Sequence, residues 1–374
     1  MSKMSRNKSK KQSMRKFLIA FSITITAFVV LGGSGYAIFR AIAQPPDLER
    51  YVTFDILLDN RENESAFIIT DVVGSELLGG EVVITDDSLR QEERTITFER
   101  RPYFYTFLIY GLDDGINADT IIVAAFDAEA RQAYLISIPR DTRVDVERRQ
   151  GLRKLVAAFP IGTQQGRGHA GGVEQLKTEI STLIGFRPDF YIGVNHRGFT
   201  RLIDTLGGVE VTIPFRMVYN DPYQDLHINL HPGQQRLNGE QALHFARFRQ
   251  FNRDCPYARN FTDFQRMESQ QQIISSAVNE LLSPRTITQI PQLVSIFNEN
   301  VRTNISASEM LYFIQYAPSL AGGNILTTYS YPIARTERVG WYEIPDKEAA
   351  LELINRTINP FTQDIMPEML RIVE

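Results

Sequence analysis

The chain has 374 residues, and at about 150 residues per domain this length predicts roughly two domains. Hydrophobic residues make up 43% and charged residues 22% of the sequence, which excludes a wholly disordered or collagen-like protein. The single cysteine, Cys255, cannot form an internal disulfide, and a four-cysteine metal site is excluded for the same reason.

The net charge of −4 hides an uneven distribution along the chain. Residues 1–16 hold seven lysines and arginines and no acidic residue, which leaves 33 basic against 44 acidic residues in the rest of the chain. An acidic body argues against a nucleic-acid-binding domain. Membrane topology explains the basic tail better than a nucleic-acid arm does, so we expect no nucleic-acid partner.

An uncharged stretch follows the basic tail directly. Residues 17–39 form a run of 23 residues without a charged side chain, and a helix of that length spans about 34 Å, enough to cross a bilayer. The basic flank places residues 1–16 in the cytoplasm and everything after Arg40 outside the cell. A cleaved signal peptide is the alternative, because Ala41-Ile42-Ala43 has the form of a cleavage site. The long apolar stretch and the position of Arg40 favour a retained transmembrane helix, which makes the protein a single-pass protein of the cell membrane.

Residues 40–103 are predicted to form a stalk or a small accessory β-segment outside the membrane. Two prolines between Gln44 and Asp47 end any helix that continues from the anchor. Turn signals then separate short β-runs at 67–69, 81–84 and 95–98. We find no chemistry-bearing motif in this segment.

From residue 104 the pattern changes to strands that alternate with helices. The apolar run from Tyr105 to Tyr110 is typical of a strand that is buried on both faces of a sheet. This alternation predicts an α/β fold, a three-layer α/β/α sandwich with a mixed central sheet. The further predicted strands are 120–126, 132–138, 190–194, 209–213 and 326–331, and the predicted helices are 173–184, 199–206 and 267–282.

Charged side chains cluster where the predicted strands and helices begin or end, which is where ligands usually bind. Asp113 follows one predicted strand, Asp119 precedes the next, and Arg140 follows a third. The other candidates stand at the ends of two helical segments and are Arg247, Arg249, Asp263, Arg266 and Gln270.

These residue types together suit a pyrophosphate with magnesium. Two carboxylates can share a hard divalent cation, and guanidinium groups can each donate two hydrogen bonds to phosphate oxygens. Taken one at a time, each residue could equally be a turn residue, a helix cap or part of a solvated surface. No Walker loop, nucleophile elbow or zinc-protease motif is present, and the five histidines lack metal-ligand spacing.

Several separate motifs occur in a defined order, and in this combination the chain resembles the LytR-CpsA-Psr family. The resemblance covers residues 104–356, with a C-terminal tail at 357–374. The motifs are Asp119-Thr120-Ile121-Ile122, Leu135 to Thr142 (LISIPRDT), Phe199 to Asp204 followed by Leu206 to Val211, Leu237 to Arg249 (LNGEQALHFARFR), and Asp263 to Arg266 with Gln270-Gln271.

The resemblance implies a membrane-anchored phosphotransferase that moves a glycopolymer from a polyprenyl-pyrophosphate carrier to peptidoglycan, with Mg²⁺ at the pyrophosphate. Two alternatives stay open: a non-catalytic polyprenyl-pyrophosphate-binding or regulatory protein, and a pyrophosphatase that uses water as the acceptor. By matching motif positions, the resemblance implies Asp113 and Asp119 as metal ligands, Arg140, Arg247, Arg249, Arg266 and Gln270 as pyrophosphate-binding residues, and Arg140, Asp263 and Arg266 as catalytic residues.

The sequence departs from the family pattern in three places. Asn117 and Ser269 stand where the family often has arginine, and the segment at 250–262 is longer than usual. That segment brings in Arg253 and Arg259, which could replace the two missing guanidinium groups.

Two further expectations concern apolar faces and the cysteine. Cys255 is interpreted as an incidental thiol, because no paired base is evident. Some apolar helix residues pack the core, and the resemblance implies that they also leave a channel for an isoprenoid tail: Leu176, Ile180, Leu183, Ile273 and Ile274.

Overall fold

The computed structural model describes residues 43–58, 66–68, 92–113, 116–146, 153–223, 226–252, 255–256, 261–281, 283, 300–316 and 326–372. The chain falls into two compact units. Of the described residues, 43–47 and 305–315 form the smaller unit, which contains helix α9 (Ala307–Ile314). The sheets and the other described helices belong to the larger unit.

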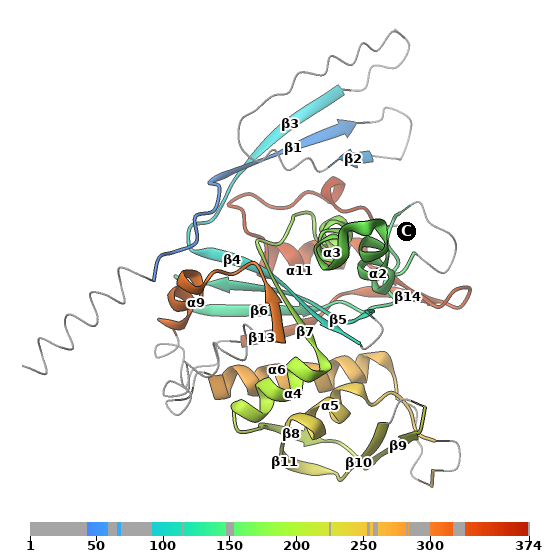
Figure 1. Ribbon diagram of the computed structural model, residues 1–374. Coiled ribbons are helices and arrows are strands. Elements are labelled where there is room, and N and C mark those ends of the chain that lie inside the picture. The colour runs from blue at the N-terminus through green and yellow to red at the C-terminus, as the bar shows by residue number, and fades with distance from the viewer. Residues whose placement is uncertain are drawn as a thin grey trace, which may run out of the picture. The chain divides into compact units, whose positions relative to one another are not determined.

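A mixed sheet forms the centre of the larger unit (Figure 1). Within the described residues its strands are β4 (Phe104–Leu112), β5 (Ala118–Asp127), β6 (Gln132–Ser137), β7 (Phe190–Asn195), β12 (Val301–Thr303) and β13 (Leu326–Ser330). They lie in the order β12-β7-β4-β5-β6-β13, with β4 parallel to β7, β6 parallel to β13 and the other neighbours antiparallel. The predicted α/β class with a mixed central sheet is confirmed.

Helices cover both faces of this sheet (Figure 1). One face carries α2 (Ala158–Gly162), α3 (Gly168–Ile184) and α11 (Lys347–Thr357), with the short segments η1 (Leu155–Ala157), η2 (Thr163–Arg167) and η3 (Pro367–Met369). The other face carries α4 (His196–Thr205), α5 (Gly239–Arg247) and α6 (Asp263–Leu281). Three antiparallel strand pairs also belong to the larger unit: β8 (Val209–Ile213) with β11 (Gly233–Leu237), β9 (Met217–Asp221) with β10 (Leu226–Leu230), and β14 (Ile333–Glu337) with β15 (Tyr342–Pro345).

Strand β4 explains why the sequence shows a continuous apolar run instead of an alternating pattern. Successive residues of a strand point to opposite faces of the sheet. Leu108 and Tyr110 belong to the core that includes Leu176 of α3, whereas Ile109 belongs to a second cluster with Ile274 of α6. Both faces of the strand are therefore buried under helices.

Helix α5 begins at the Leu-Asn-Gly-Glu-Gln motif because these residues cap it and seat it on α4. The Asn238 side chain accepts a hydrogen bond from the Gln241 N–H (2.9 Å), and the Gln241 side chain accepts one from the Asn238 N–H (3.1 Å). The Gly239 N–H donates to Asp204 of α4 (2.7 Å). A Cβ at Gly239 would lie 2.2 Å from the Thr200 carbonyl oxygen, so only glycine allows this approach.

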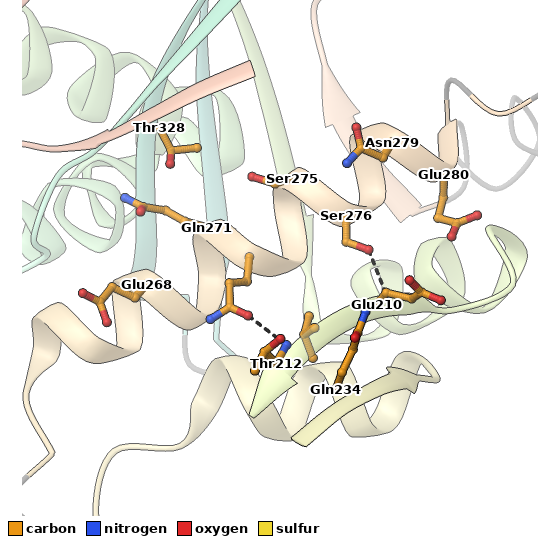
Figure 2. A pocket seen from close by; sticks show the side chains of 12 residues that line it. Glu210, Thr212, Gln234, Glu268, Gln271, Ser275, Ser276, Asn279, Glu280 and Thr328 are labelled. Atoms are coloured by element: carbon orange, nitrogen blue, oxygen red, sulfur yellow. Dashed lines mark hydrogen bonds between the residues drawn. The ribbon is translucent and has the colours of Figure 1, made fainter. Parts of the chain in front are cut away.

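Helix α6 is held against the outer edge of β8 by side-chain hydrogen bonds (Figure 2). Ser276 Oγ accepts from the Glu210 N–H at 2.7 Å, and Gln272 Oε1 accepts from the Thr212 N–H at 3.0 Å. Both donors belong to the edge of β8 that faces away from β11, where backbone groups need partners. These bonds fix α6 relative to the strands beside it.

The segment that precedes the central sheet also joins its core. Strands β1 (Tyr51–Leu58), β2 (Ala66–Ile68) and β3 (Glu92–Glu99) form an antiparallel sheet in the order β2-β1-β3. Phe54 of β1 and Phe98 of β3 pack edge-on at 5.3 Å, and both contact the Phe361 ring. The expected β-structure between residues 40 and 103 is therefore present, and the run predicted at 81–84 lies outside the described residues.

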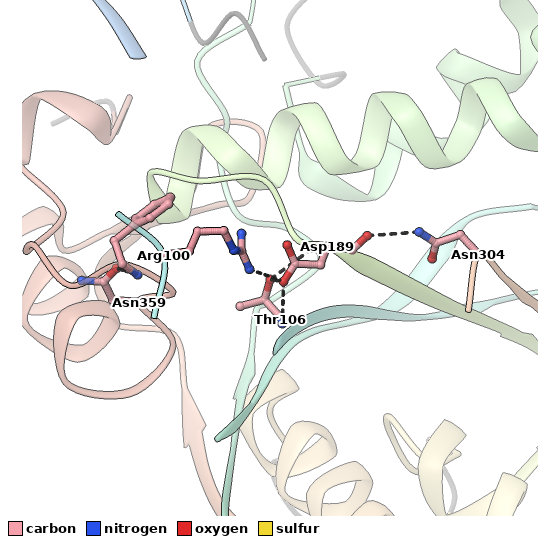
Figure 3. Close-up of polar contacts among 6 residues, drawn as sticks. Arg100, Thr106, Asp189, Asn304 and Asn359 are labelled. Atoms are coloured by element: carbon pink, nitrogen blue, oxygen red, sulfur yellow. Dashed lines mark hydrogen bonds and ion pairs between the residues drawn. The ribbon is translucent and has the colours of Figure 1, made fainter. Parts of the chain in front are cut away.

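A buried ion pair ties the start of β7 to its neighbours (Figure 3). Asp189 Oδ2 accepts hydrogen bonds from Arg100 Nη2 (2.8 Å), from the Thr106 N–H (2.9 Å) and from Thr106 Oγ1 (2.7 Å). The side chains of Arg100 and Asp189 are 11% and 7% exposed. Asn304 donates to the Asp189 carbonyl oxygen at 3.1 Å, so the same residue also holds the segment that follows β12.

Replacing Asp189 by alanine is expected to lower the free energy of unfolding by about 3 kcal/mol, because it leaves the Arg100 charge buried. Equilibrium denaturation in urea measures this loss. The control is Glu99→Ala, which breaks the exposed pair with Arg50 and should lower the free energy of unfolding far less. Equal losses in the two variants would contradict the structural role of Asp189.

The basic tail at 1–16 and the predicted membrane anchor at 17–39 lie outside the described residues. Among the residues that the structure does describe, no helix is long and apolar enough to cross a bilayer.

Candidate functional site

A cavity of about 970 Å³ lies between the central sheet and helices α4, α5 and α6. Its wall combines charged groups with a large apolar surface. The polar lining residues include Asp113, Asn117, Asp119, Arg140, Asp141, Lys154, Arg247, Arg249, Gln250, Arg266 and Gln270, and the apolar ones include Ile109, Val194, Phe199, Leu243, Ile273 and Ala277. Seven of the eight site residues predicted from the sequence are therefore brought together in this cavity.

Asp113 lies in a tight loop between β4 and β5, where Asn117 holds its carboxylate. The Asn117 N–H donates to Asp113 Oδ1 at 2.7 Å, and Asn117 Nδ2 donates to Asp113 Oδ2 at 2.9 Å. The Asp113 N–H donates in return to the Asn117 carbonyl oxygen at 3.0 Å. Asn117, which departs from the family pattern, thus fixes the orientation of a predicted metal ligand.

Arg140 lies in the middle of a row of alternating charges along the cavity wall. Arg140 Nη1 contacts Asp119 Oδ1 at 2.5 Å, and Arg140 Nε lies 3.8 Å from Asp141 Oδ2. Lys154 Nζ contacts the other oxygen of Asp141 at 2.9 Å. Arg140 is 14% exposed and Asp119 is 36% exposed, so the carboxylate is the more accessible partner.

Lys154 and Asp141 are lining residues that the sequence analysis did not propose. Asp141 stands in the predicted Leu135 to Thr142 motif, so its neighbour Arg140 could have indicated it. Lys154 belongs to no motif and reaches the cavity because the Leu155 N–H donates to the Thr142 carbonyl oxygen at 3.0 Å. No sequence pattern predicts this backbone hydrogen bond.

The remaining cations approach the cavity from α5 and α6. Arg247 is the last residue of α5, and Arg249 lies two residues later in the chain. Arg266 lies in the first turn of α6 with 4% of its surface exposed. Gln270, one turn later, donates to the Ala246 carbonyl oxygen at 3.4 Å and so links α6 to α5. Helices therefore carry Arg247 and Arg266, and the segment that follows α5 carries Arg249.

An aromatic cluster makes the chain return from α5 to α6. The Phe248 ring is fully buried and lies 5.0 Å from both the Phe251 and the Phe261 rings. Phe251 and Phe261 stand near opposite ends of the 250–262 segment, so the two described ends of this segment lie close together beside Phe248.

The other predicted residues have mixed outcomes. Asp263 is the first residue of α6, but its side chain is outside the described part of the structure, as are Arg253 and Arg259. Ser269 is buried and donates to a backbone carbonyl one turn earlier in α6. Cys255 is a half-buried thiol.

The predicted apolar helix residues separate into two groups. Leu176, Ile180 and Leu183 are fully buried in the core between α3 and the sheet, on the face opposite the cavity. Ile273 and Ile274 of α6 line the cavity. The α6 residues expected to border a channel therefore border a cavity, whereas the α3 residues do not line this cavity.

Tyr110 lines the cavity and is hydrogen-bonded to a histidine beneath it. Tyr110 Oη lies 2.9 Å from His169 Nε2. Burial raises the pKa of Tyr110, so the phenol stays neutral. Burial, with a smaller contribution from Arg302, lowers the pKa of His169 from 6.5.

The lowered pKa of His169 predicts a loss of stability in mild acid. The unfolded chain binds a proton near pH 6.5 and the folded chain does so only at lower pH, so the free energy of unfolding falls as the pH drops below about 6.5 until the folded pKa is reached. His169→Gln should flatten the stability profile between about pH 7 and pH 5, measured by urea denaturation. An exposed histidine changed in the same way, His231→Gln, should keep the wild-type profile, and equal profiles in all three proteins would contradict the prediction.

Comparison with known proteins identifies the family. A sequence model of the LytR_cpsA_psr family matches residues 82–358. The chain belongs to this family. The LytR-CpsA-Psr resemblance inferred from separate motifs is therefore confirmed over most of the chain.

Named relatives come from several bacteria. The chain is 26% identical over 307 residues to polyisoprenyl-teichoic acid–peptidoglycan teichoic acid transferase TagV of Bacillus subtilis, covering 80% of this chain and 66% of TagV. It is 28% identical over 303 residues to the transferase of the same kind, TagU, of Oceanobacillus iheyensis, covering 79% of this chain and 87% of TagU. It is 29% identical over 190 residues to regulatory protein MsrR of Staphylococcus aureus, covering 51% of this chain and 52% of MsrR.

The fold agrees with a solved structure of the family. The crystal structure of B. subtilis TagV superposes with a TM-score of 0.54 at 25% identity, covering 68% of this chain and 95% of the TagV chain. The α/β architecture with a mixed sheet is therefore shared with a LytR-CpsA-Psr protein.

Proposed function

We propose that this LytR-CpsA-Psr protein is a phosphotransferase that moves a glycopolymer from a polyprenyl-pyrophosphate carrier to a hydroxyl group of peptidoglycan. One observation carries the proposal: a single cavity joins guanidinium groups and carboxylates to a wide apolar wall. Such a donor has an anionic headgroup and a hydrocarbon tail, and each part matches one kind of wall. The names of TagV and TagU, which specify a polyisoprenyl-linked donor and peptidoglycan, support the same class.

Magnesium fits the carboxylates at the polar end of the cavity. Mg²⁺ is usually held by one or two carboxylates together with substrate phosphates and water. Asp113 and Asp119 both line the cavity and supply such ligands. No group of three or more metal-ligating side chains occurs within the described part of the chain, so the site would need the pyrophosphate oxygens to complete it. Bound Mg²⁺ would neutralise phosphate charge.

Asn117 should set how tightly this metal binds. Asn117→Ala removes the bond to Asp113 Oδ2 and lets the carboxylate rotate, and loss of such a supporting bond typically weakens metal affinity about 10- to 100-fold. The half-saturating Mg²⁺ concentration should rise by about that factor while the rate at saturating Mg²⁺ stays near wild type. A Mg²⁺ titration of transfer measures it, with the exposed Asn229→Ala as control. An unchanged titration curve in Asn117→Ala would contradict the role.

The arginines supply the electrostatics of the reaction. Phosphoryl transfer depends mainly on positioning and on stabilising the charge that develops on phosphate oxygens. Arg140, Arg247, Arg249 and Arg266 can donate to those oxygens, and Gln270 supports them from α6. Arg140 exchanges its contact with Asp119 for the phosphate when the donor enters. Asp263, at the start of α6, would orient the arginines or the headgroup.

The bond changes follow from the donor. The oxygen of the acceptor hydroxyl forms a bond to the phosphorus that carries the glycan, and the hydroxyl proton ends on the leaving polyprenyl phosphate. The bond from that phosphorus to the bridging oxygen breaks, and polyprenyl phosphate leaves with the bonding electrons. The apolar wall holds the departing tail.

Membrane anchoring by residues 17–39 is part of the proposal. A donor with a polyprenyl tail is itself confined to the membrane, so an anchored enzyme meets it there. Protease added to intact cells should digest the region after Arg40 and spare residues 1–16. Recovery of a soluble mature chain that begins at Gln44 would overturn the anchor in favour of a cleaved signal.

The activity is tested with the purified full chain in detergent, Mg²⁺ and a polyprenyl-pyrophosphate-linked glycan. Release of polyprenyl phosphate that depends on an added peptidoglycan acceptor is the expected result. Release without acceptor would identify a pyrophosphatase, and binding without release would identify a binding or regulatory protein, the class that the name of MsrR suggests.

A further inference from the structure

A second hollow, the polar groove, lies on the side of α6 that faces away from the cavity (Figure 2). It has a volume of about 640 Å³. Its walls are α6, the β8–β11 strand pair and Thr328 of β13. The proposed phosphotransfer reaction does not use it.

The two faces of α6 follow from helical periodicity. Arg266, Gln270 and Ile273 repeat at three- and four-residue intervals and line the cavity, whereas Glu268, Ser275 and Asn279 line the polar groove. Residues at these offsets lie on opposite sides of a helix with 3.6 residues per turn. One helix therefore carries the phosphate-binding groups on one side and a polar surface on the other.

The chemistry of the polar groove differs from that of the cavity. Carboxamide, hydroxyl and carboxylate groups line it, with Val211 as the one apolar side chain among the described lining residues. No lysine or arginine is among those residues, and three of them, Glu210, Glu268 and Glu280, are acidic. Glu210 and Glu280 both pair with Arg236, at 3.4 Å and 2.6 Å, and Glu268 adds a further negative charge. Carboxylates repel an anionic polymer, while amides and hydroxyls both donate and accept hydrogen bonds. This composition favours an uncharged ligand rich in hydroxyl and amide groups.

The wall of the polar groove is fixed before a ligand binds. Gln272 and Ser276 hold α6 to the edge of β8 through their oxygen atoms. The Gln272 carboxamide keeps its N–H groups and Ser276 keeps its hydroxyl proton for a ligand. Along α6 the groove extends from Glu268 to Glu280, which is about 18 Å at 1.5 Å per residue. That length accommodates a chain of several sugar rings.

The polar groove also begins close to the phosphate-binding residues. Glu268, at one end, follows Arg266 by two positions in the first turns of α6. The groove and the cavity therefore lie on two sides of the same part of α6, with Glu268 and Arg266 about 3 Å apart along the helix axis.

We propose that the polar groove binds the uncharged sugar chain of the acceptor glycan. This inference rests on the proposed phosphotransferase function for its biological meaning, because the acceptor must be held while its hydroxyl attacks the donor. Glu268 disfavours an anionic donor glycopolymer in the groove, and the amide and hydroxyl groups favour the uncharged glycan.

The test combines direct binding with transfer kinetics on the purified full chain in detergent. The probe for binding is an uncharged oligomer of N-acetylated amino sugars, titrated by calorimetry. The groove variant changes Gln234, Ser275 and Asn279 together to alanine and keeps Gln272 and Ser276, which hold β8. The control is Glu352→Ala on the exposed side of α11.

The groove variant should bind the oligomer at least about tenfold more weakly than wild type, because several hydrogen bonds are lost together. Its KM for the glycan acceptor should rise by a similar factor, with the KM for the donor unchanged. The control should match wild type in both measurements.

Equal binding by wild type and the groove variant, or no binding by wild type, would overturn the proposal. A rise in the donor KM alone would assign the groove to the donor and overturn it as well. If wild type binds the oligomer, the groove variant does not, and no polyprenyl phosphate is ever released, the groove assignment stands and the proposed phosphotransferase function fails.

Discussion

Replacing Asp119 by alanine is expected to lower Mg²⁺-dependent transfer by about a thousandfold. Charge neutralisation by a bound metal contributes several kcal/mol to a phosphoryl-transfer transition state, and about 4 kcal/mol corresponds to three decades in rate. Asp119 also holds Arg140 at 2.5 Å, so its loss disturbs a second phosphate-binding group. The measurement is the initial rate of transfer at saturating donor and acceptor.

The control for this variant is Asp145→Ala, which removes an exposed carboxylate from the loop that follows Arg140. It should keep the wild-type rate and melting temperature. Thermal melting of Asp119→Ala measures the stability lost when Arg140, whose side chain is 14% exposed, is left without its closest carboxylate. Removal of Mg²⁺ by a chelator should reproduce the Asp119→Ala defect in the wild-type protein. Wild-type transfer that continues in chelator would contradict the metal assignment for Asp113 and Asp119.

Loss of one guanidinium group is expected to lower turnover by roughly tenfold to several hundredfold. Each charged hydrogen bond to a phosphate contributes about 1.5–3 kcal/mol, and 1.4 kcal/mol is one decade in rate. Arg249→Ala tests this at an exposed position and Arg266→Ala at a buried one. Lysine at either position should restore only part of the rate, because an ammonium group lacks the two-pronged donor geometry.

The matched control for the arginines is Arg335→Ala, an exposed arginine of β14 outside the cavity. Thermal melting of Arg266→Ala separates a folding defect from a loss of phosphate binding. Wild-type turnover in both Arg249→Ala and Arg266→Ala would contradict the phosphate-binding role of the cluster. Whether Arg253 and Arg259 replace missing family arginines stays a prediction, since both lie outside the described residues.

Sequence patterns predicted the sheet because its strands carry local signals. The run Tyr105–Tyr110 contains apolar residues on both faces, and the structure places it in β4 with a helix layer on each side. The α5 start at Asn238 was part of a quoted motif, and its capping box explains why those residues occur together. Buried strands and helix caps of this kind can be predicted from a single sequence, because the residues that form them are close together in the chain.

The site was predictable where motifs marked it and not where tertiary contacts created it. Asp119, Arg140 and Arg266 stand at element ends within motifs, and all three line the cavity. Lys154 comes from a loop without any motif, because pairing of distant backbone segments places it there. In the sequence, position 117 was notable only because asparagine replaces an arginine that the family often has. The hydrogen bonds from Asn117 to Asp113 depend on the folded loop.

The polar groove could not be predicted from the sequence for a related reason. Ser275 and Asn279 look like ordinary solvated residues of an amphipathic helix. Their significance depends on the β8–β11 pair and Thr328 standing beside α6, and these come from other parts of the chain. Sequence periodicity predicts that a helix has a polar face, but it does not predict which other elements lie opposite that face.

The most direct test of the central claim is the stoichiometry of a single reaction. The purified full chain is supplied with Mg²⁺, a donor labelled in both glycan and polyprenyl parts, and a peptidoglycan acceptor, and both products are counted. We expect equal amounts of polyprenyl phosphate released and of glycan joined to peptidoglycan through a phosphodiester. Polyprenyl phosphate released without any glycan attached to peptidoglycan, or neither product formed, would contradict this expectation.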